Sequence, residues 1–480
     1  MPNDRRSFLK LTGLAGIGVG TGSILKRFSG NRENDDTGLL LSPYERSKSP
    51  EFNMCGYTAP KLETVRTGFI GLGQRGPAHL KNMSKLENVE INALCDLRPD
   101  KVQSAQKLLE GSTHHPTLYT GQTDAWKKLC ERPDIDLVFI ATPWDLHTPM
   151  ALYAMKHGKH VCIEVPAAVT VDECWQLVET SEQTRKYCMM MENCCYDFFE
   201  LLTLNMARQG FFGEIIHCEG SYIHNILEEI FSKHAYWDMW RLRQNAHRDG
   251  NLYPTHGLGP LCQIMNINRG EKMDHLISMS GNDFMMGAKA KALAGSDDFF
   301  KPFADKHYRG NMNTTCIRTH TGRTLMIQHD VTSPNIYSRI HKISGTKGSA
   351  LKYPLPGRIS ISSDDEWLPE EKIESLKQKY QPDIVNKVGE LAKQVGGHGG
   401  MDFLMDWRTI DCLRNGLPLD EDVYDAALWS VISPLSEWSV ANKSKAINIP
   451  DFTRGAWSTN EPVDLTISHK NLTAVRQIQG

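Results

Sequence analysis

A glycine-rich segment near residue 70 has the spacing of a phosphate-binding turn. An apolar run begins at Val65, and Gly71, Gly73 and Gly76 follow it in the pattern Gly-x-Gly-x-x-Gly. The first glycine of such a pattern allows a tight turn, the second lets the backbone approach a pyrophosphate, and the third lets a helix pack on the strand. Because unpaired amides at a helix start favour negative charge, the pattern predicts a dinucleotide here.

An acidic residue after the next apolar run makes this prediction more specific. The run 89–96 ends in Asp96, which lies about 20 residues beyond the glycines, where dinucleotide-binding domains carry an acid. A carboxylate there accepts hydrogen bonds from both ribose hydroxyls and repels a 2′-phosphate, which favours NAD over NADP. The alternative is an ordinary glycine loop beside a solvated aspartate.

A second set of reactive residues lies at Tyr253, Pro254, Thr255 and His256. Proline and glycine flank this turn, and we expect it to open a helix that projects tyrosine and histidine into one pocket. An unperturbed imidazole has a pKa of about 6.5, which suits proton removal near neutrality. From the residues alone, a helix-capping role for His256 stays open.

Two further segments follow predicted strands. One contains Trp144 to His147, and the other contains Glu164, Val165 and Pro166. Ligands bind at the carboxyl ends of strands in open α/β sheets, so both segments should face the nicotinamide half of the cofactor. The second segment resembles the Glu-Lys-Pro of the Gfo/Idh/MocA oxidoreductases, whose lysine is an acid/base. Because alcohol oxidation needs a group that takes the hydroxyl proton, Val165 indicates another base or different chemistry.

The pattern of apolar runs predicts which elements position these residues. Over residues 65–195 apolar runs alternate with helical segments, which predicts a parallel sheet with crossover helices, a Rossmann-type dinucleotide-binding domain. Over residues 196–480 strands mostly follow one another directly, which predicts an α+β domain with a mainly antiparallel sheet.

The predicted strands are 65–71, 89–96, 137–142, 161–165, 188–193, 215–222, 275–280, 313–319, 324–331 and 339–345. The predicted helices are 78–86, 99–110, 123–130, 148–157, 171–186, 198–208, 401–415 and 422–440. The lysine- and glutamate-rich stretch 366–380 is interpreted as a solvated surface excursion.

Composition excludes several classes of protein. The chain has 480 residues, which favours two domains. The net charge of −3 provides no electrostatic footprint for nucleic acid. The 12 cysteines form no Cys-x-x-Cys pair, so we expect neither a disulfide framework nor a zinc site, and no metal is predicted.

The amino terminus resembles an export signal. Arg5 and Arg6 precede Ser-Phe-Leu-Lys and a glycine-rich apolar run, which predicts a twin-arginine signal over residues 1–31 and a periplasmic protein. The run is too short and glycine-rich for a membrane span of about 20 residues. Since no clean Ala-x-Ala site follows, both a cleaved signal and an uncleaved anchor stay open. Residues 32–64 are predicted to form an extended arm.

Several of these segments together resemble glycoside hydrolase family 109, a branch of Gfo/Idh/MocA that contains NAD-dependent α-N-acetylgalactosaminidases. They are residues 71–76, 144–147, 164–166, 253–260, 333–339 and 396–403, and the resemblance extends over about residues 65–438. Two departures concern fine specificity: Asp145-Leu146 stands where Glu-Trp is expected, and Asn335-Ile336 where Arg-Pro is usual.

The resemblance implies a glycosidase that oxidises C3 of its sugar with bound NAD, removes the acidified C2 proton, eliminates the C1 substituent, adds water and reduces the sugar again. His256 and Tyr253 are then the catalytic residues. The implied NAD-binding residues are Gly71, Gly73, Gln74, Arg75, Gly76, Asp96, Trp144, Asp145, Leu146, His147, Glu164, Val165 and Asn193. The implied substrate-binding residues are Tyr222, Arg241, Tyr253, Pro254, Thr255, His256 and Tyr337.

Some alternatives stay open at this point. Tyr222 could be a core residue, and His398 could belong to an active-site turn or only to a helix entry. An exported sugar dehydrogenase that holds NAD tightly and uses a second sugar as acceptor is the competing function, and release of an aglycone without added NAD distinguishes the two. The expected partner is a small-molecule or glycan substrate. The natural glycan is not determined by the sequence, and a homo-oligomer stays open.

Overall fold

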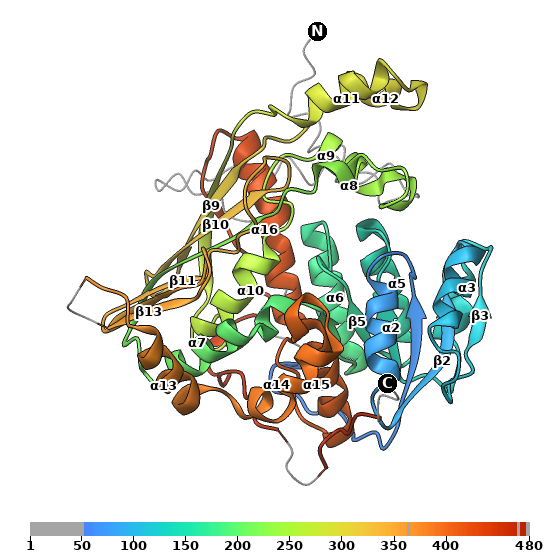
Figure 1. Ribbon diagram of the computed structural model, residues 1–480, viewed down its shortest axis with the longest axis horizontal. Helices are drawn as coiled ribbons and strands as arrows, with labels where there is room; N and C mark the ends of the chain where they lie inside the picture. Colours follow the sequence, from blue (N-terminus) through green and yellow to red (C-terminus); the bar gives the residue numbers. More distant parts are fainter. Residues whose placement is uncertain (1–51, 362–364, 468–470, 477–480) are drawn as a thin grey trace, which may run out of the picture.

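The computed structural model describes residues 52–361, 365–467 and 471–476 (Figure 1). The predicted signal, residues 1–31, and the first part of the predicted arm, residues 32–51, lie outside the described residues. The rest of the arm packs on the protein body: the Ala59 amide donates to the Tyr187 hydroxyl at 2.7 Å, and the Leu62 amide donates to the Leu413 carbonyl at 3.1 Å.

The first sheet contains six strands in the order β3-β2-β1-β4-β5-β6, and all pairs are parallel. The strands are β1 Val65–Ile70, β2 Val89–Cys95, β3 Thr117–Tyr119, β4 Leu137–Ile140, β5 His160–Ile163 and β6 Cys188–Met190. The strand order reverses between β1 and β4, which is where open α/β sheets bind ligands. The predicted Rossmann fold is confirmed, although β3, a short and mostly exposed edge strand, was missed.

The crossover helices of this domain are α2 Gly76–Ser84, α3 Pro99–Lys107, α4 Ala125–Cys130, α5 His147–Lys156 and α6 Val171–Thr184. The start of α6 shows why the chain becomes helical there. The Thr170 side chain accepts from the Glu173 amide while the Glu173 carboxylate accepts from the Thr170 amide, a reciprocal capping box.

The second sheet contains eight strands in the order β13-β12-β11-β7-β10-β9-β8-β14. Only the central pair, β7 with β10, is parallel, so the predicted mainly antiparallel domain is confirmed. The strands are β7 Ile215–Ile223, β8 Met273–Ser280, β9 Asn313–Thr319, β10 Thr324–Asp330, β11 Lys342–Gly345, β12 Gly348–Leu351, β13 Arg358–Ile361 and β14 Ile447–Asn448.

Three differences from the predicted elements have simple causes. The predicted strand 339–345 begins only at Lys342, because Ile340 and His341 adopt φ values of 60° and 48° that interrupt an extended chain. The stretch 366–380 is mostly exposed as expected, but it contains a helix, α13 Glu370–Tyr380, that buries Ile373. The short strands β12 to β14 were missed because runs of two to four residues carry almost no periodic signal.

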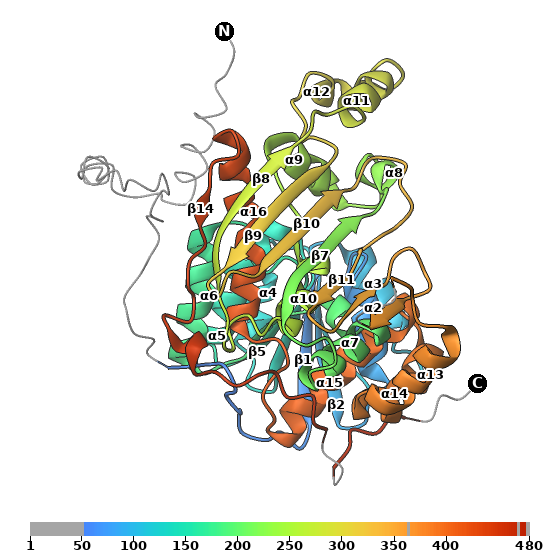
Figure 2. The same cartoon turned by 90° about the vertical axis from the view of Figure 1, so that its left-hand side faces the viewer.

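The remaining helices lie on one side of this sheet or extend from its ends, as the two views show (Figures 1 and 2). They are α7 Phe198–Arg208, α8 Leu227–Ile230, α9 Trp240–His247, α10 Thr255–Ile264, α11 Met286–Ala294, α12 Lys301–Ala304, α14 Asp383–Val395, α15 Met401–Asn415 and α16 Val423–Ala441. Helix α16 packs on both β8 and α6, and α15 packs on α2, so the carboxyl-terminal helices join the two sheets. No helix among the described residues is long and apolar enough to cross a membrane.

Helix α10 lies in backbone contact with β7 because glycines face one another across the interface. A Cβ atom on Gly220 would lie 2.2 Å from the carbonyl oxygen of Gly257, and one on Gly257 would lie 2.3 Å from the Ser221 amide nitrogen. This approach brings the start of α10, with Tyr253 and His256, beside Tyr222 of β7.

We therefore expect Gly257→Ala to lower the free energy of unfolding by roughly 1–3 kcal/mol, the usual cost of overpacking. Alanine is favoured over glycine inside a helix by about 1 kcal/mol, but backbone atoms at 2.3 Å cannot move aside as a flexible side chain would. Urea unfolding measures the difference. Gly295→Ala is the control, since its Cβ would meet nothing closer than 3.4 Å. Equal stability of the two variants would contradict this account of the interface.

Candidate active site

A cavity of about 920 Å³ runs along the carboxyl ends of the parallel strands and reaches β7 and α10. It brings most of the predicted site residues together. Its wall contains Gly71, Gly73, Gln74, Arg75, Asp96, Trp144, Leu146, His147, Glu164, Val165, Asn193, Tyr222, Arg241, Tyr253 and His256. The predicted residues outside the wall are Gly76, Asp145, Pro254, Thr255 and Tyr337.

The glycine turn has the shape that a dinucleotide requires. Gly71 has a φ of +89°, and a Cβ there would lie 2.5 Å from the Ala141 carbonyl oxygen. A Cβ on Gly76 would lie 2.0 Å from the Gly71 carbonyl oxygen, whereas Gly73 faces open space. No side-chain hydrogen bond caps the start of α2, and the helix dipole favours an anion at this end of the helix. These residues fit a pyrophosphate.

Asp96 stands at the end of β2, on the cavity wall. Its carboxylate accepts from the Leu72 amide at 2.7 Å and from the Arg98 amide at 2.9 Å. The contact with Leu72 fixes the carboxylate against the glycine turn, which is the position from which a ribose can be bound.

Farther along the cavity, buried ion pairs join the two domains. The Arg75 guanidinium donates to Glu164 at 2.9 Å and to Asp402 of α15 at 3.0 Å. Asp402 also accepts from Asn193 at 2.6 Å and pairs with His398 at 2.8 Å. Burial raises the pKa of Asp402, but the His398 hydrogen bond and the Arg75 charge outweigh it and hold that pKa far below its usual range. The predicted pyrophosphate contact of Arg75 stays a prediction beside this cluster.

His79 completes the same cluster, and sequence reasoning missed it. The ring is fully buried on α2, with Nδ1 2.7 Å from Asp406 and Nε2 2.9 Å from Glu164. Burial by itself lowers the pKa of His79, but the charge and hydrogen bond of Asp406 raise it to about 9. His79 is therefore a buried cation at neutral pH.

Three aromatic rings meet where α10 begins. The centroids of Tyr222, Tyr253 and His256 lie 4.8–5.1 Å apart. Burial raises the pKa of the Tyr253 hydroxyl well above its usual range, so that group stays protonated and can donate. Tyr222 is buried and also lines the cavity, so it can be a core residue and still contact a sugar.

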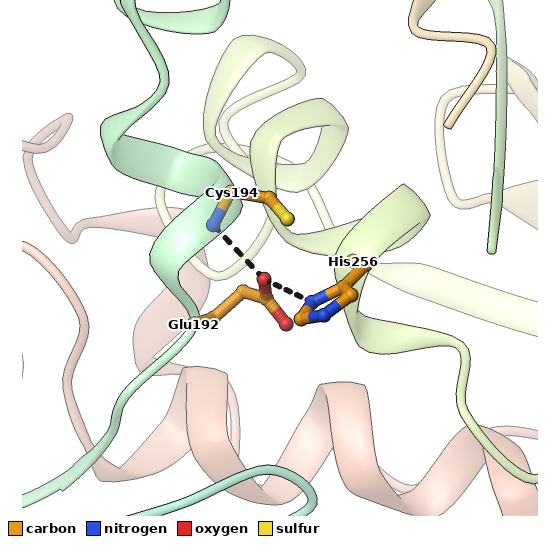
Figure 3. Close-up of side chains that lie close together, drawn as sticks. All are labelled: Glu192, Cys194 and His256. Carbon is orange, nitrogen blue, oxygen red and sulfur yellow. Dashed lines mark hydrogen bonds and ion pairs between the residues drawn. The ribbon is translucent and has the colours of Figure 1, made fainter. Parts of the chain in front are cut away.

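His256 is paired with a buried carboxylate. Its Nδ1 lies 2.6 Å from Oε1 of Glu192, and the same oxygen accepts from the Cys194 amide at 3.1 Å (Figure 3). Burial raises the pKa of Glu192, but its contacts with His256, the Thr255 side chain and the Cys194 amide outweigh burial and lower that pKa. Glu192 was missed, although it directly precedes Asn193 at the end of a predicted strand.

The Cys194 thiol lies near this pair, and ligand atoms of Glu192, Cys194 and His256 lie within 4.8 Å of one another. Complete burial raises the pKa of the Cys194 thiol well above its ordinary value. Because the thiolate is the form that ligates metals, the arrangement suits a hydrogen-bonded pair better than a metal centre.

Arg241 lies in a cage of aromatic rings. Its guanidinium carbon is 5.3–5.5 Å from the ring centroids of Trp144, Tyr236 and Tyr253, and it donates to the Tyr236 hydroxyl at 3.0 Å. Trp240 packs edge-on against Trp144 at 5.1 Å. Tyr236 and Trp240 also line the cavity and were missed, although both lie just before Arg241 in the sequence.

Predicted site residues that lie outside the cavity wall contact residues in it or next to it. Asp145 accepts from Gln244 at 2.9 Å, and the Thr255 side chain lies buried beside Glu192. The Tyr337 hydroxyl accepts from Arg339 at 3.2 Å, and its ring lies 5.0 Å from that of His224, which is in the wall.

Two histidines connect wall segments. Both ring nitrogens of His147 lie 2.7 Å from carbonyl oxygens, those of Pro166 and Thr142, so this ring links the two strand-end segments. His398 belongs to the short turn before α15, and its side chain is in the cavity wall.

Comparison with known proteins agrees with this architecture. Residues 65–192 match the family described as oxidoreductase family, NAD-binding Rossmann fold, and residues 196–459 match glycosyl hydrolase 109, C-terminal domain. The chain is thus a glycoside hydrolase built on an NAD-binding oxidoreductase fold. It belongs to glycoside hydrolase family 109, and the predicted resemblance is confirmed.

Several relatives share most of their length with the chain. It is 49% identical over 419 residues to glycosyl hydrolase family 109 protein 1 of Phocaeicola vulgatus, covering 84% of this chain and 86% of that one. It is 50% identical over 417 residues to the alpha-N-acetylgalactosaminidase of Bacteroides fragilis, covering 85% and 97%. A Shewanella pealeana family 109 protein is 44% identical over 474 residues, covering 97% and 99%.

Solved structures share the fold at low identity. A levoglucosan dehydrogenase in complex with NADH is 16% identical with a TM-score of 0.60, covering 81% of this chain and 100% of that one. The aldose-aldose oxidoreductase of Caulobacter crescentus is 16% identical with a TM-score of 0.56, covering 80% and 100%.

The buried cation predicts how stability depends on pH. The pKa of His79 is about 9 in the folded protein and about 6.5 when unfolded, so protonation stabilises the fold by roughly 3 kcal/mol. This contribution is fully present below about pH 6.5 and is lost as the pH rises through about 9. His79→Gln should therefore lower the free energy of unfolding most near pH 6. The gap between the unfolding free energies of the variant and the parental protein should become smaller toward pH 9.5.

His160→Gln is the control for this measurement by urea unfolding. Burial lowers the pKa of His160 to about 3, so this histidine is neutral in the fold and its contribution is constant above about pH 7. If the loss of unfolding free energy in His79→Gln is as large at pH 9.5 as at pH 6, His79 is not a buried cation.

Proposed function

We propose that this protein hydrolyses α-N-acetylgalactosaminides or related α-glycosides with NAD that it retains through each turnover. The observation that carries the proposal is that one cavity contains both the glycine turn and the paired Tyr253 and His256. The 50% identity to a protein named alpha-N-acetylgalactosaminidase supports the choice of sugar.

The residues divide the work in a way that suits this reaction. Bound NAD supplies reversible oxidation of a sugar hydroxyl, here assigned to C3. Arg241, in its aromatic cage, and Tyr222 bind the sugar hydroxyls and the acetamido group. Tyr253 stays protonated and donates to a sugar oxygen, whereas His256 takes the proton from C2, which an adjacent ketone makes acidic.

Val165 argues against the competing sugar dehydrogenase. Its side chain is in the wall and is only 5% exposed, at the position where the resembling oxidoreductases carry a lysine acid/base. A valine cannot exchange a proton, so the lysine-dependent reaction of those oxidoreductases does not fit this site, and the hydroxyl proton released when C3 is oxidised must pass to a group other than residue 165.

Export remains our proposal for localisation. A twin-arginine signal carries folded proteins, so it suits an enzyme that binds its cofactor in the cytoplasm and acts in the periplasm. Retention of NAD is then essential, because no pool of free cofactor would replace it after export.

The homo-oligomer that the sequence left open has a candidate surface. The outer face of the second sheet exposes Ile277, Met279 and Cys316, an apolar patch of the kind that partners cover. Sedimentation measurements determine the oligomeric state.

The purified protein should release NAD when denatured and should hydrolyse an α-linked nitrophenyl N-acetylgalactosaminide without added cofactor. Asp96→Ala should weaken NAD binding by about 1–3 kcal/mol, the cost of losing hydrogen bonds to a charged acceptor, and added NAD should restore its activity. Recovery of NADP, or activity of the parental protein in strict proportion to added NAD, would count against the proposal.

His256→Ala and Tyr253→Phe should each lower turnover by roughly 10²–10⁴-fold, the usual contribution of a positioned acid or base. Bound NAD should stay close to the parental value in both variants, and the phenylalanine preserves the ring packing. His256→Ala leaves the buried Glu192 without its partner and should lower the melting temperature, so turnover is compared per folded molecule. If His256 only caps the helix, its replacement costs about 1 kcal/mol of stability and leaves turnover per folded molecule unchanged. That outcome excludes the catalytic assignment.

A further inference from the structure

The pairing of His256 with Glu192 limits how the imidazole can be protonated. The Glu192 side chain is completely buried, whereas the His256 side chain is 13% exposed and belongs to the cavity wall. The 2.6 Å contact is made by Nδ1 of the imidazole. Because a carboxylate can only accept, Nδ1 carries the proton and Nε2 is left with a free lone pair.

Glu192 is held in place by several other groups. Its Oε1 also accepts from the Cys194 amide, and its own amide donates to Glu421 at 3.2 Å. Its second oxygen, Oε2, is buried and has no hydrogen bond of good geometry among the described residues, although the Thr255 side chain lies beside the carboxylate. A buried carboxylate with an unsatisfied oxygen is costly to maintain, which favours a role other than stabilising the fold.

A neighbouring buried glutamate, Glu421, differs from Glu192 in its protonation state. Burial and the charge of Glu192 raise the pKa of Glu421 well above its ordinary value, so Glu421 is a neutral acid. Two adjacent buried carboxyl groups with opposite protonation states indicate that the partner of each decides its charge. Of these two glutamates, Glu192 is the one that is hydrogen-bonded to an imidazole.

We propose that Glu192 is a positioning residue that holds His256 in the tautomer able to remove the C2 proton and stabilises the imidazolium that results. This inference rests on the proposed function. The C2 proton moves to Nε2 of His256, and the electron pair of the C2–H bond forms the C1–C2 double bond. The C1–O bond breaks with its electron pair leaving on the aglycone oxygen. The negative charge of Glu192 compensates the positive charge that His256 acquires.

The matched pair Glu192→Gln and Glu421→Gln tests the proposal. Glutamine at 192 keeps the shape but removes the charge, and its amide can donate to Nδ1 and so reverse the tautomer. We expect Glu192→Gln to lower kcat by roughly 10²–10⁴-fold with little change in KM, bound NAD or melting temperature. Glu421→Gln replaces a neutral acid by a neutral amide and should keep the parental kcat. Glu192→Asp retains the charge and should recover part of the activity.

An isotope effect separates this role from a structural one. If the C2 proton transfer is the step that Glu192 assists, a substrate deuterated at C2 should react more slowly than the protiated one, and the ratio in Glu192→Gln should equal or exceed the parental ratio. The proposal is overturned if the isotope effect in Glu192→Gln falls toward one or if Glu192→Gln keeps the parental kcat. It is also overturned if Glu192→Gln and Glu421→Gln lose kcat equally. Failure of the proposed function itself is distinguishable, because the parental protein would then show no hydrolysis and no solvent deuterium at C2 of the product.

Discussion

The buried ion pairs between the parallel sheet and α15 are the constraint on which the site depends. Arg75 and His79 come from the glycine turn and the helix after it, while Asp402 and Asp406 come from a helix more than 320 residues later in the chain. Burial raises the pKa of Glu164, but Arg75 and His79 outweigh it and bring that pKa to about 2. Removing one partner would leave an uncompensated charge in the interior, which typically costs 3–5 kcal/mol. The cofactor turn and the second domain are therefore fixed to each other as one unit.

The same cavity has two electrostatic environments. At the cofactor end charged groups are paired with one another and with backbone amides. At the sugar end Arg241 is surrounded by aromatic rings, and the His256–Glu192 pair lies beside Tyr222. The glycine contact between α10 and β7 sets the distance between these groups, since no side chain separates the two backbones. Backbone packing therefore determines where the proton acceptor faces the substrate.

The sequence predicts best those site residues whose position follows from a local rule of strands and turns. The glycine pattern, Asp96 and the strand-end segments were predictable, because each follows from a rule that links position in a strand to position in a sheet. His79 and Asp406 could not be found, because each is a single polar residue on a helix and their pairing depends on how α2 and α15 pack. Glu192 could have been found, since the rule that indicated Asn193 applies equally to the residue before it. Tyr337 carries a strong motif signal, yet its ring reaches the cavity only through His224.

The carboxylates of this cavity argue for proton removal from carbon over conventional glycosidase chemistry. That chemistry uses two carboxyl groups about 5–10 Å apart, one as acid and one as nucleophile or base. Among the described residues the acids in the wall are Asp96 and Glu164. Asp96 is occupied by two backbone amides, and Glu164 is ionised between Arg75 and His79, so it can neither donate a proton nor attack an anomeric carbon freely. Glu192 is buried behind His256. The groups placed to exchange protons with the sugar include Tyr253 and the His256 imidazole. An imidazole base can open a glycosidic bond by elimination when a neighbouring ketone has made a carbon-bound proton acidic, which is the chemistry that a bound nicotinamide permits.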